Sequence, residues 1–522
     1  KPLESTLPFN IKVSEGDVYW PLIGDKAITA LIPNIRAKGD LNKYQFSGSL
    51  YIEGKDVPQT DIRLEGKGDT SSVNLHDLLI DTLGGQVSGG IEIDWRSLLQ
   101  WKGDIDLQNI QPGIQWEAAE GNISGRIETS GSLTDKGGWN ALIPVIDIKG
   151  IFRKYPLDVN GSLFAHDKDG QGEINIDIPS LALHHGDNGI EVTGEVNKEL
   201  DLNVDVNFPE LSDSVPDLYG KLFGKVALTG KVTEPKIELD IDALGLKWKK
   251  EATLKKASIN GYIVPMPKIN ADLRVDLSKG QYKKQILEAL NIKFNGKEES
   301  HRLSVNLDSN VVDSYLVIDG ALDRKKAWKG ELSKAEIKTE IGPWKLDKKA
   351  ALAYDIQTSE VFVQANCWSQ GVTSLCLNKD LLAGKSGIVD LSVNHFEFSK
   401  LKAFLPEETK VNGEANLNVI AKWEEQKKPY VKAALYLPKG NVQQQMEQPL
   451  IIGWDEIKVN AEMEDDVLNA NWLIGLTGNG QLNGQMLIDD LTGKKTIKGI
   501  SNIEALSLSM FEPALGEYSQ LQ

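Results

Sequence analysis

The stretch "LDLNVDVNFPEL" at residues 200–211 alternates apolar and polar side chains almost without interruption. The two sets occupy opposite parities, with Leu200, Leu202, Val204, Val206 and Phe208 on one and Asp201, Asn203, Asp205 and Asn207 on the other. Because successive side chains of a strand point to opposite faces, this stretch predicts a β-strand with one apolar and one polar face. The pattern recurs along most of the chain, so the fold depends on what covers the apolar face.

Similar alternating segments lie at residues 101–110, 122–133, 224–241, 413–423 and 430–437. Glycine, asparagine, aspartate and proline separate them, which is typical of turns between antiparallel strands. Only three short segments are helix candidates, at residues 212–223, 282–291 and 399–405. The sequence therefore predicts an all-β fold with few short helices and roughly 35–40 strands of ~5–10 residues.

A strand with one apolar face needs a second layer packed against that face. The three helix candidates are too few to supply this layer. Two layouts remain: the sheet closes or sandwiches on itself, or it curls into an open groove whose apolar inside is filled by something other than the chain.

Internal repetition is visible in two places. "GQVSGGIEIDW" at residues 85–95 matches "GQLNGQMLIDD" at residues 480–490 in five positions. The tripeptide "WKG" occurs at Trp101 and again at Trp328. We expect both tryptophans to pack or to mark strand ends, and a role at a lipid interface is the alternative.

A looser correspondence relates residues 200–235 to residues 389–429. Divergent copies of one supersecondary unit explain these matches. Since no linker interrupts them, we expect residues 1–522 to form one continuous repeating array.

Composition and charge exclude several classes of partner. The 522 residues carry a formal net charge of −17, which argues against nucleic acid and against electrostatic adhesion to anionic membrane surfaces. No apolar run approaches the ~18 residues of a membrane span, and no signal peptide opens the chain. The sequence begins at Lys1, and we interpret it as a segment of a longer or processed protein.

The two cysteines, Cys367 and Cys376, are nine positions apart with Gly371 between them. A hairpin with this spacing brings the sulfurs together. In an oxidising compartment they would form a disulfide, and in a reducing compartment they would be free thiols. The pair forms neither a CxxC redox motif nor a zinc ligand set.

Two segments contain residue types that can bind metals, but each is a weak match to a metal-binding motif. Residues 166–174, "HDKDGQGEI", resemble the start of a calcium loop, but Ile178 stands where the loop needs a bidentate glutamate. We interpret the segment as a polar hairpin turn. His184 and His185 lack a second pair of ligands and are interpreted as an exposed turn. No nucleophile, base and orienting group can be assembled, so we expect no enzyme, no cofactor and no metal site.

Five stretches carry a family resemblance. They are "VYWPLIG" (18–24), "TLGGQVSGGIEIDWRSLLQWKGDIDLQNI" (82–110), "LFGKVALTGKVTEPKIELDIDALGLKW" (222–248), "IGPWKLDKKAALAYD" (341–355) and "NCWSQGVTSLCL" (366–377). In this order and spacing they resemble the TamB family, the inner-membrane-anchored component of the translocation and assembly module of Gram-negative bacteria. The resemblance extends over essentially all 522 residues and corresponds to a central segment of the longer family members.

The resemblance implies an elongated, repeating β-groove of the AsmA-like, bridge-like lipid-transfer type: a curled, mostly antiparallel sheet with a hydrophobic concave interior. It also implies the periplasm, in a protein anchored to the inner membrane by a segment not present here. Implied roles are lipid transport towards the outer membrane and outer membrane biogenesis, including autotransporter assembly with TamA, which regions outside this segment would contact. A cysteine pair of the family matches Cys367 and Cys376, which implies that they form the disulfide.

On such a fold the apolar parity would line the groove and hold phospholipid acyl chains. The candidate lining residues are Leu200, Leu202, Val204, Val206, Phe208, Val226, Leu228, Val232, Ile237, Leu239, Ile241, Leu417 and Val419. The alternative hypothesis is a chaperone or scaffold for outer-membrane β-barrel polypeptides without lipid transport. A third is a closed structural rod without cargo.

Overall fold

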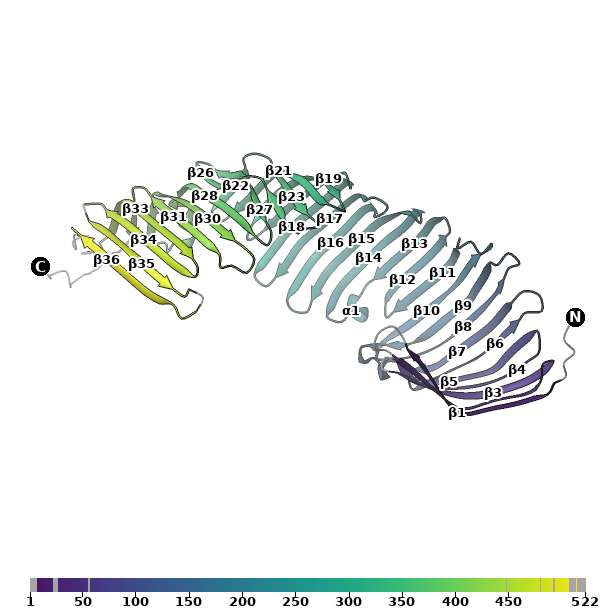
Figure 1. Ribbon diagram of the computed structural model, residues 1–522. Coiled ribbons are helices and arrows are strands. Elements are labelled where there is room, and N and C mark those ends of the chain that lie inside the picture. Colours follow the sequence, from purple (N-terminus) through teal and green to yellow (C-terminus); the bar gives the residue numbers. More distant parts are fainter. Residues whose placement is uncertain are drawn as a thin grey trace. The chain divides into compact units, whose positions relative to one another are not determined.

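The computed structural model describes residues 7–21, 27–54, 57–446, 448–478, 480–491, 493–506 and 513. The chain divides into two units, Lys1–Ile269 and Asn270–Gln522. Each unit is a curled antiparallel sheet (Figure 1). Across these ranges, no helix has the length and apolar character that a membrane span requires. The prediction of an all-β, mostly antiparallel fold is confirmed.

The described part of the first unit contains sixteen strands, two 3₁₀ turns and one short α-helix. They are β1 (Phe9–Pro21), β2 (Ala27–Asp40), β3 (Lys43–Gly54), β4 (Val57–Gly68), β5 (Ser72–Thr82), β6 (Gly85–Asp94), β7 (Gln100–Ile110), η1 (Pro112–Ile114), η2 (Glu117–Ala119), β8 (Gly121–Leu133), β9 (Trp139–Phe152), β10 (Tyr155–Asp167), β11 (Asn175–His185), β12 (Asn188–Val196), β13 (Glu199–Phe208), α1 (Leu211–Ser214), β14 (Leu218–Lys231), β15 (Glu234–Trp248) and β16 (Ala252–Val264).

The described part of the second unit contains twenty strands and one 3₁₀ helix. They are β17 (Asn270–Tyr282), β18 (Gln285–Lys297), β19 (Ser300–Ser309), β20 (Asp313–Asp323), β21 (Ala327–Thr339), β22 (Gly342–Leu346), β23 (Ala350–Asp355), β24 (Val361–Val363), β25 (Asn366–Gln370), β26 (Thr373–Leu377), β27 (Leu381–Ala383), β28 (Gly387–Glu397), η3 (Phe398–Phe404), β29 (Thr409–Asn412), β30 (Glu414–Trp423), β31 (Tyr430–Leu437), β32 (Gly440–Gln444), β33 (Leu450–Glu464), β34 (Val467–Leu476), β35 (Gln481–Asp489) and β36 (Thr496–Glu504).

Bulges bend the long strands of the first unit. The pairing of β10 with β9 shifts between Gly161 and Leu163, and the pairing of β11 with β12 shifts between Ile178 and Leu181. A bulge adds a residue to one strand, increases the local twist and bends the strand. Because such shifts recur between neighbouring strands, the sheet curls instead of lying flat.

The second unit contains long strands that are broken in the middle. β21 pairs through Glu336–Thr339 with β22 and through Ala327–Leu332 with β23. The breaks continue along the next strands, so that β22 pairs with β25 while β23 pairs with β24. Both rows meet again on β28, which pairs with β26 and with β27. The sheet is therefore continuous across the breaks, although strands such as β22 and β25 pair without being consecutive in the chain.

Two of the three helix predictions are wrong. Residues 212–223 contain only the one-turn helix α1, after which β14 begins and pairs with both β13 and β15. Residues 282–291 belong to β17, a turn and β18. A bulge at Glu288 shifts the pairing with β19, so the apolar positions around it acquire a spacing that imitates a helix. Residues 399–405 do form a short helix, the 3₁₀ helix η3.

The internal correspondences relate equivalent elements. Residues 85–95 and 480–490 contain the strands β6 and β35. Residues 200–235 contain β13, the short helix α1 and β14, and residues 389–429 contain β28, η3 and the strands β29 and β30. The looser match therefore reflects one strand–short helix–strand pattern that occurs in both units.

Very few side chains are fully buried. Across the described ranges the buried apolar residues are Ile110, Leu211, Ala243, Ala271, Val317, Ala335, Ala350, Cys376 and Trp454. Several of them are small alanines, and a packed second layer would bury many more large apolar side chains. The curled sheets thus have no conventional core in the part of the chain that the structure describes.

Candidate functional site: the apolar face

The predicted apolar residues of the first unit lie opposite one another across adjacent strands. Val204 pairs with Val192 on β12 and with Val226 on β14, and Val226 pairs with Leu239 on β15. Directly paired residues project from the same face of a sheet. These side chains therefore form a ladder, which is a row of apolar residues that runs across neighbouring strands and not along any single strand.

Parallel ladders lie on either side of this one. One joins Leu202, Leu228, Ile237 and Ile263, and another joins Val206, Gly224, Ile241 and Ile259. At the ends of β13, Leu200 pairs with Val196 and Phe208 pairs with Leu222. Val232 lies apart from the ladders, because it occupies the turn between β14 and β15 and is 49% exposed.

The two candidate residues of the second unit are arranged in the same way. Val419 lies between Leu391 on β28 and Ala433 on β31. Leu417 lies between Val393 and Leu435. The ladder through Leu417 continues to Val459 on β33 and Trp472 on β34. Each unit therefore has its own apolar ladders.

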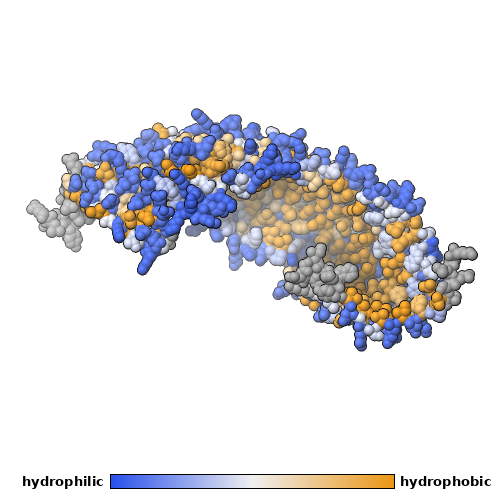
Figure 2. Space-filling model, in the orientation of Figure 1, coloured by the Kyte–Doolittle hydropathy of each residue, from blue (hydrophilic) through white to orange (hydrophobic). Residues whose placement is uncertain are grey.

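The apolar face is not covered by another layer of the described chain. Along β13 every apolar residue is half-buried and every residue between them is exposed. None of the thirteen candidate lining residues belongs to the buried set. In the first unit, Figure 2 shows a hollowed face where apolar residues gather, bordered by polar residues at the strand ends (Figure 2). This arrangement matches the open layout.

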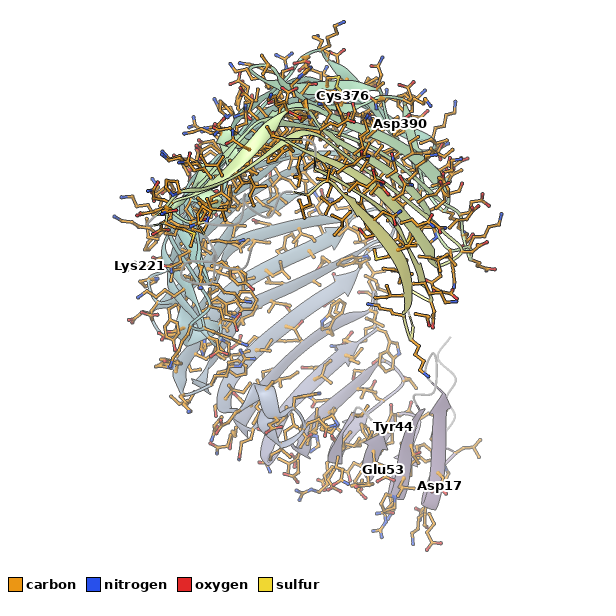
Figure 3. The ribbon with its side chains drawn as sticks, turned by 90° about the vertical axis from the view of Figure 1, so that its left-hand side faces the viewer. Asp17, Tyr44, Glu53, Lys221, Cys376 and Asp390 are labelled. Atoms are coloured by element: carbon orange, nitrogen blue, oxygen red, sulfur yellow. A yellow bond between two sulfur atoms is a disulfide. The ribbon has the colours of Figure 1, made fainter. Side chains whose placement is uncertain are left out.

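The opposite face of the sheet is polar and carries cross-strand ion pairs. Lys225 lies 3.4 Å from Asp205, and Arg302 donates to Asp319 at 2.6 Å. The hydrogen bond from Arg302, followed by one from Ser333, holds the pKa of Asp319 below its ordinary value. Figure 3 shows Lys221 and Asp390 on this outer side (Figure 3). Exposed pairs of this kind stabilise a protein only slightly, so the polar face is chiefly a solvated surface.

Tryptophan rings pack against glycines within the sheet. A side chain on Gly131 would collide with the ring of Trp101, and one on Gly330 would collide with the ring of Trp328. The indole N–H of Trp328 donates to Nε2 of His301 at 2.9 Å. The expectation that Trp101 and Trp328 pack near strand ends is confirmed. The glycine partners could not be found from the sequence, because they depend on the register between strands.

The disulfide prediction is confirmed. Cys367 and Cys376 are bonded and lie directly opposite each other on the hairpin of β25 and β26. Cys376 is 8% exposed and pairs on its other side with Ser392 of β28. The bond therefore joins adjacent strands at the place where the long strands of this unit are broken.

The segment that resembles a calcium loop is a hairpin turn, as predicted. It joins β10 to β11, and the Asp167 carboxylate accepts a hydrogen bond from the N–H of Gly172 at 2.7 Å. Asp169 forms an ion pair with Lys136 at 3.3 Å. Both carboxylates therefore bind groups of the protein. Among the described residues, no cluster of histidine, cysteine, aspartate and glutamate has a metal-binding arrangement.

The expectation of an exposed turn at His184–His185 is wrong, because both residues belong to the strand β11. His185 ends this strand and is only 6% exposed. Its Nδ1 lies 3.0 Å from Oγ of Ser214 and its Nε2 lies 2.7 Å from the carbonyl oxygen of Phe152. Asn188 also donates to Oγ of Ser214, at 2.8 Å. The histidine thus attaches the loop containing α1 to the neighbouring strand ends.

Comparisons with known proteins agree with this geometry. The family model described as "TamB, N-terminal domain" matches residues 1–522. The chain is 24% identical over 497 residues to the translocation and assembly module subunit TamB of Haemophilus influenzae. It is 22% identical over 476 residues to an uncharacterized protein of Buchnera aphidicola from Acyrthosiphon pisum, and 20% identical over 364 residues to one from Schizaphis graminum.

The chain is shorter than these relatives. The alignments cover 91%, 88% and 67% of the chain, but only 36%, 45% and 34% of the respective relatives. The chain thus spans less than half the length of each of them.

Proposed function

The chain belongs to the TamB family, whose N-terminal-domain model matches residues 1–522, and from this premise we propose that its apolar face is a conduit for phospholipid acyl chains. The half-buried ladders across β12–β15 carry this proposal. They offer a long apolar surface that the described chain does not cover. No bond is made or broken in the proposed process, so the protein acts without enzymatic chemistry.

The energetics favour an occupant of this face that is apolar and long. Each methylene group removed from water contributes ~0.8 kcal/mol, so exposing a sixteen-carbon chain costs about 12 kcal/mol. Because the ladders repeat from strand to strand, an acyl chain would keep nearly the same burial at each position. It could therefore slide along the face over small barriers, with its headgroup in water.

Membership of the family supports our proposal that this process takes place in the bacterial envelope. The Haemophilus influenzae relative is named as a subunit of the translocation and assembly module. We propose that this chain serves the same module in the periplasm, in a protein anchored to the inner membrane, and moves phospholipid between the inner and outer membranes. Contact with TamA would be made by other regions of the protein.

A charged side chain on the apolar face tests the proposal. We expect Val204→Asp and Leu228→Asp to lose most of the phospholipid that co-purifies with the protein, because an ionised carboxylate in an acyl-chain site costs several kcal/mol. Asn203→Asp and Ala227→Asp are matched controls, since these residues are paired with each other on the opposite face. Mass spectrometry of extracted lipids, with circular dichroism to verify folding, provides the measurement. Equal lipid content in lining variants and controls would refute the conduit.

An extended apolar polypeptide would fit the same ladders, which keeps the chaperone or scaffold function as a second candidate. A photo-reactive amino acid at Val204 or Leu417 distinguishes the two functions in cells. Crosslinks to lipid support the conduit, and crosslinks to unfolded outer-membrane β-barrel polypeptides support the chaperone.

A further inference from the structure

Six lysines and several exposed apolar side chains gather at one end of the hairpin formed by β15 and β16. We define the lysine corner as Lys221, Lys247, Lys249, Lys250, Lys255 and Lys256. The segment 244–256 contains five of these lysines and a single acidic residue, Glu251. The whole chain, by contrast, has 75 acidic and 58 basic residues. The local charge of the corner is therefore opposite to that of the protein.

Strand pairing places these residues beside one another. Lys221 pairs with Leu244, and Leu244 pairs with Lys256. One step closer to the turn, Tyr219 pairs with Lys247. Directly paired residues have Cβ atoms ~4.5–5.5 Å apart, so lysines and apolar side chains alternate over a single small surface.

The lysines of the corner have few acidic partners. Lys256 lies 4.0 Å from Asp242. Within the described part of the chain, no carboxylate lies at ion-pair distance from the other five. The N–H of Lys249 donates to the carbonyl oxygen of Asp217 at 2.9 Å, which fixes the turn without neutralising any side chain. The positive charge is thus available to a partner.

Three large apolar or aromatic side chains of the corner are exposed. Trp248 is 63% exposed, Tyr219 is 50% exposed and Leu244 is 42% exposed. Tryptophan and tyrosine favour the boundary between water and the apolar interior of a bilayer, and lysine extends its amino group towards phosphates there. The two kinds of residue together have the chemistry of a membrane-surface contact.

We propose that the lysine corner docks onto a bilayer surface that contains anionic phospholipids. The corner lies at the hairpin end of β15 and β16, on the edge of the sheet (Figure 1). An open edge suits a flat partner and does not enclose a small ion. The exposed Trp248 and Leu244 add an apolar contact that a free phosphate would leave unused. The net charge of −17 opposes adhesion of the chain as a whole, but at ~8–10 Å screening lengths the corner acts locally.

Vesicle flotation of the complete chain tests this proposal. The vesicles are phosphatidylcholine alone and phosphatidylcholine with one third phosphatidylglycerol. Each lysine near an anionic surface strengthens binding about fivefold. We therefore expect substitution of Lys247, Lys249, Lys250 and Lys255 by glutamine to weaken binding to the anionic vesicles about a hundredfold or more. Trp248→Ala should remove most of the binding that persists at high salt.

A matched control removes the same charge from the opposite strand ends. Lys136, Lys168, Lys198 and Lys231 lie in or beside the turns β8–β9, β10–β11, β12–β13 and β14–β15. Substituting these four by glutamine should leave vesicle binding unchanged. An equal loss in both variants, or no loss in either, would overturn the proposal, provided that circular dichroism shows both to be folded.

Two further measurements separate the bilayer from other anions. If inorganic phosphate releases the protein from vesicles and chloride of the same ionic strength does not, the corner is a site for a small phosphate and the proposal fails. If the corner variant keeps its vesicle binding but loses binding to polyglutamate, the partner is an acidic polypeptide and the proposal also fails. The co-purified phospholipid should stay constant in the corner variant, because the docking does not depend on the apolar face.

Discussion

At the residue scale, the contacts between tryptophans and glycines limit the tolerated substitutions more strictly than the positions on the apolar face do. The indole rings lie against the sheet at positions where a glycine has no side chain. The pairs are Trp101 on Gly131, Trp328 on Gly320 and Gly330, Trp423 on Gly387, Trp454 on Gly440, and Trp472 on Gly484. A half-exposed lining residue can be exchanged for another apolar one, but a methyl group on one of these glycines would displace a ring. These glycines therefore have a structural role without a turn or a positive φ.

Gly131→Ala tests this restriction. The added methyl group would meet both the Trp101 ring and the backbone oxygen of Asn140, so we expect a loss of about 1–3 kcal/mol in the free energy of unfolding. Urea denaturation followed by tryptophan fluorescence measures the change. Gly475→Ala is the control, because the nearest atoms to an added methyl group there are 3.6 Å away or farther. A control that loses as much stability as Gly131→Ala would mean that the ring contact is unimportant.

At the element scale, the sequence predicted strands well and bulges not at all. The alternation at residues 200–208 gives β13 with its apolar and polar faces as expected. At Glu288 one extra residue breaks the alternation, and the pattern then resembles a helix. A bulge depends on the partner strand, and a single sequence does not reveal which partner or register is chosen. For the same reason the curl of each sheet could not be derived from the alternation.

The candidate site was predictable to a similar extent. Twelve of the thirteen candidate residues lie on strands within or beside the ladders, because parity alone decides which face a strand residue occupies. Val232 has the right parity but lies past the end of β14, in a turn. The lysine corner could be found only in part from the sequence: five of its lysines lie within residues 244–256, but Lys221 and the exposed Tyr219 join them only through the pairing of β14 with β15.

The disulfide provides a prediction for one hairpin. It closes a loop of nine positions in β25 and β26, and closing a loop of this length stabilises a fold by about 2–3 kcal/mol in the chain-entropy model. We expect the double variant Cys367→Ala, Cys376→Ala to increase amide hydrogen exchange in residues 366–377. Exchange in β13, which belongs to the other unit, is the internal control and should stay unchanged. Unchanged exchange in the hairpin would show that the bond adds no local stability.

At the scale of the whole molecule, a conduit and a set of separate binding sites make different predictions. In a conduit every lipid passes each point of the apolar face. In separate sites each unit exchanges its lipid with the surroundings independently. The two arrangements can give the same amount of bound lipid, so occupancy alone does not distinguish them.

A single charged residue on the apolar face distinguishes a conduit from separate binding sites. We expect Val204→Asp, in the first unit, to abolish lipid transfer between donor and acceptor membranes by the full-length protein. The ladder through Val419, in the second unit, is unaltered in this variant, so lost transfer with an unchanged circular dichroism spectrum would indicate an obstruction and not misfolding. Normal transfer by the Val204→Asp protein would favour separate sites.

The pairing of consecutive strands in the first unit has a consequence for how this part of the protein acquires its fold. Each hairpin there needs only strands that adjoin it in sequence, so the contacts are local and the loop-closure entropy stays small. In the second unit, pairings such as β22 with β25 close longer loops. As in other quasi-one-dimensional proteins, folding can begin at any hairpin and propagate outwards. A chain that emerges gradually during synthesis or export can add strands in order, with one growing edge at a time open to mispairing.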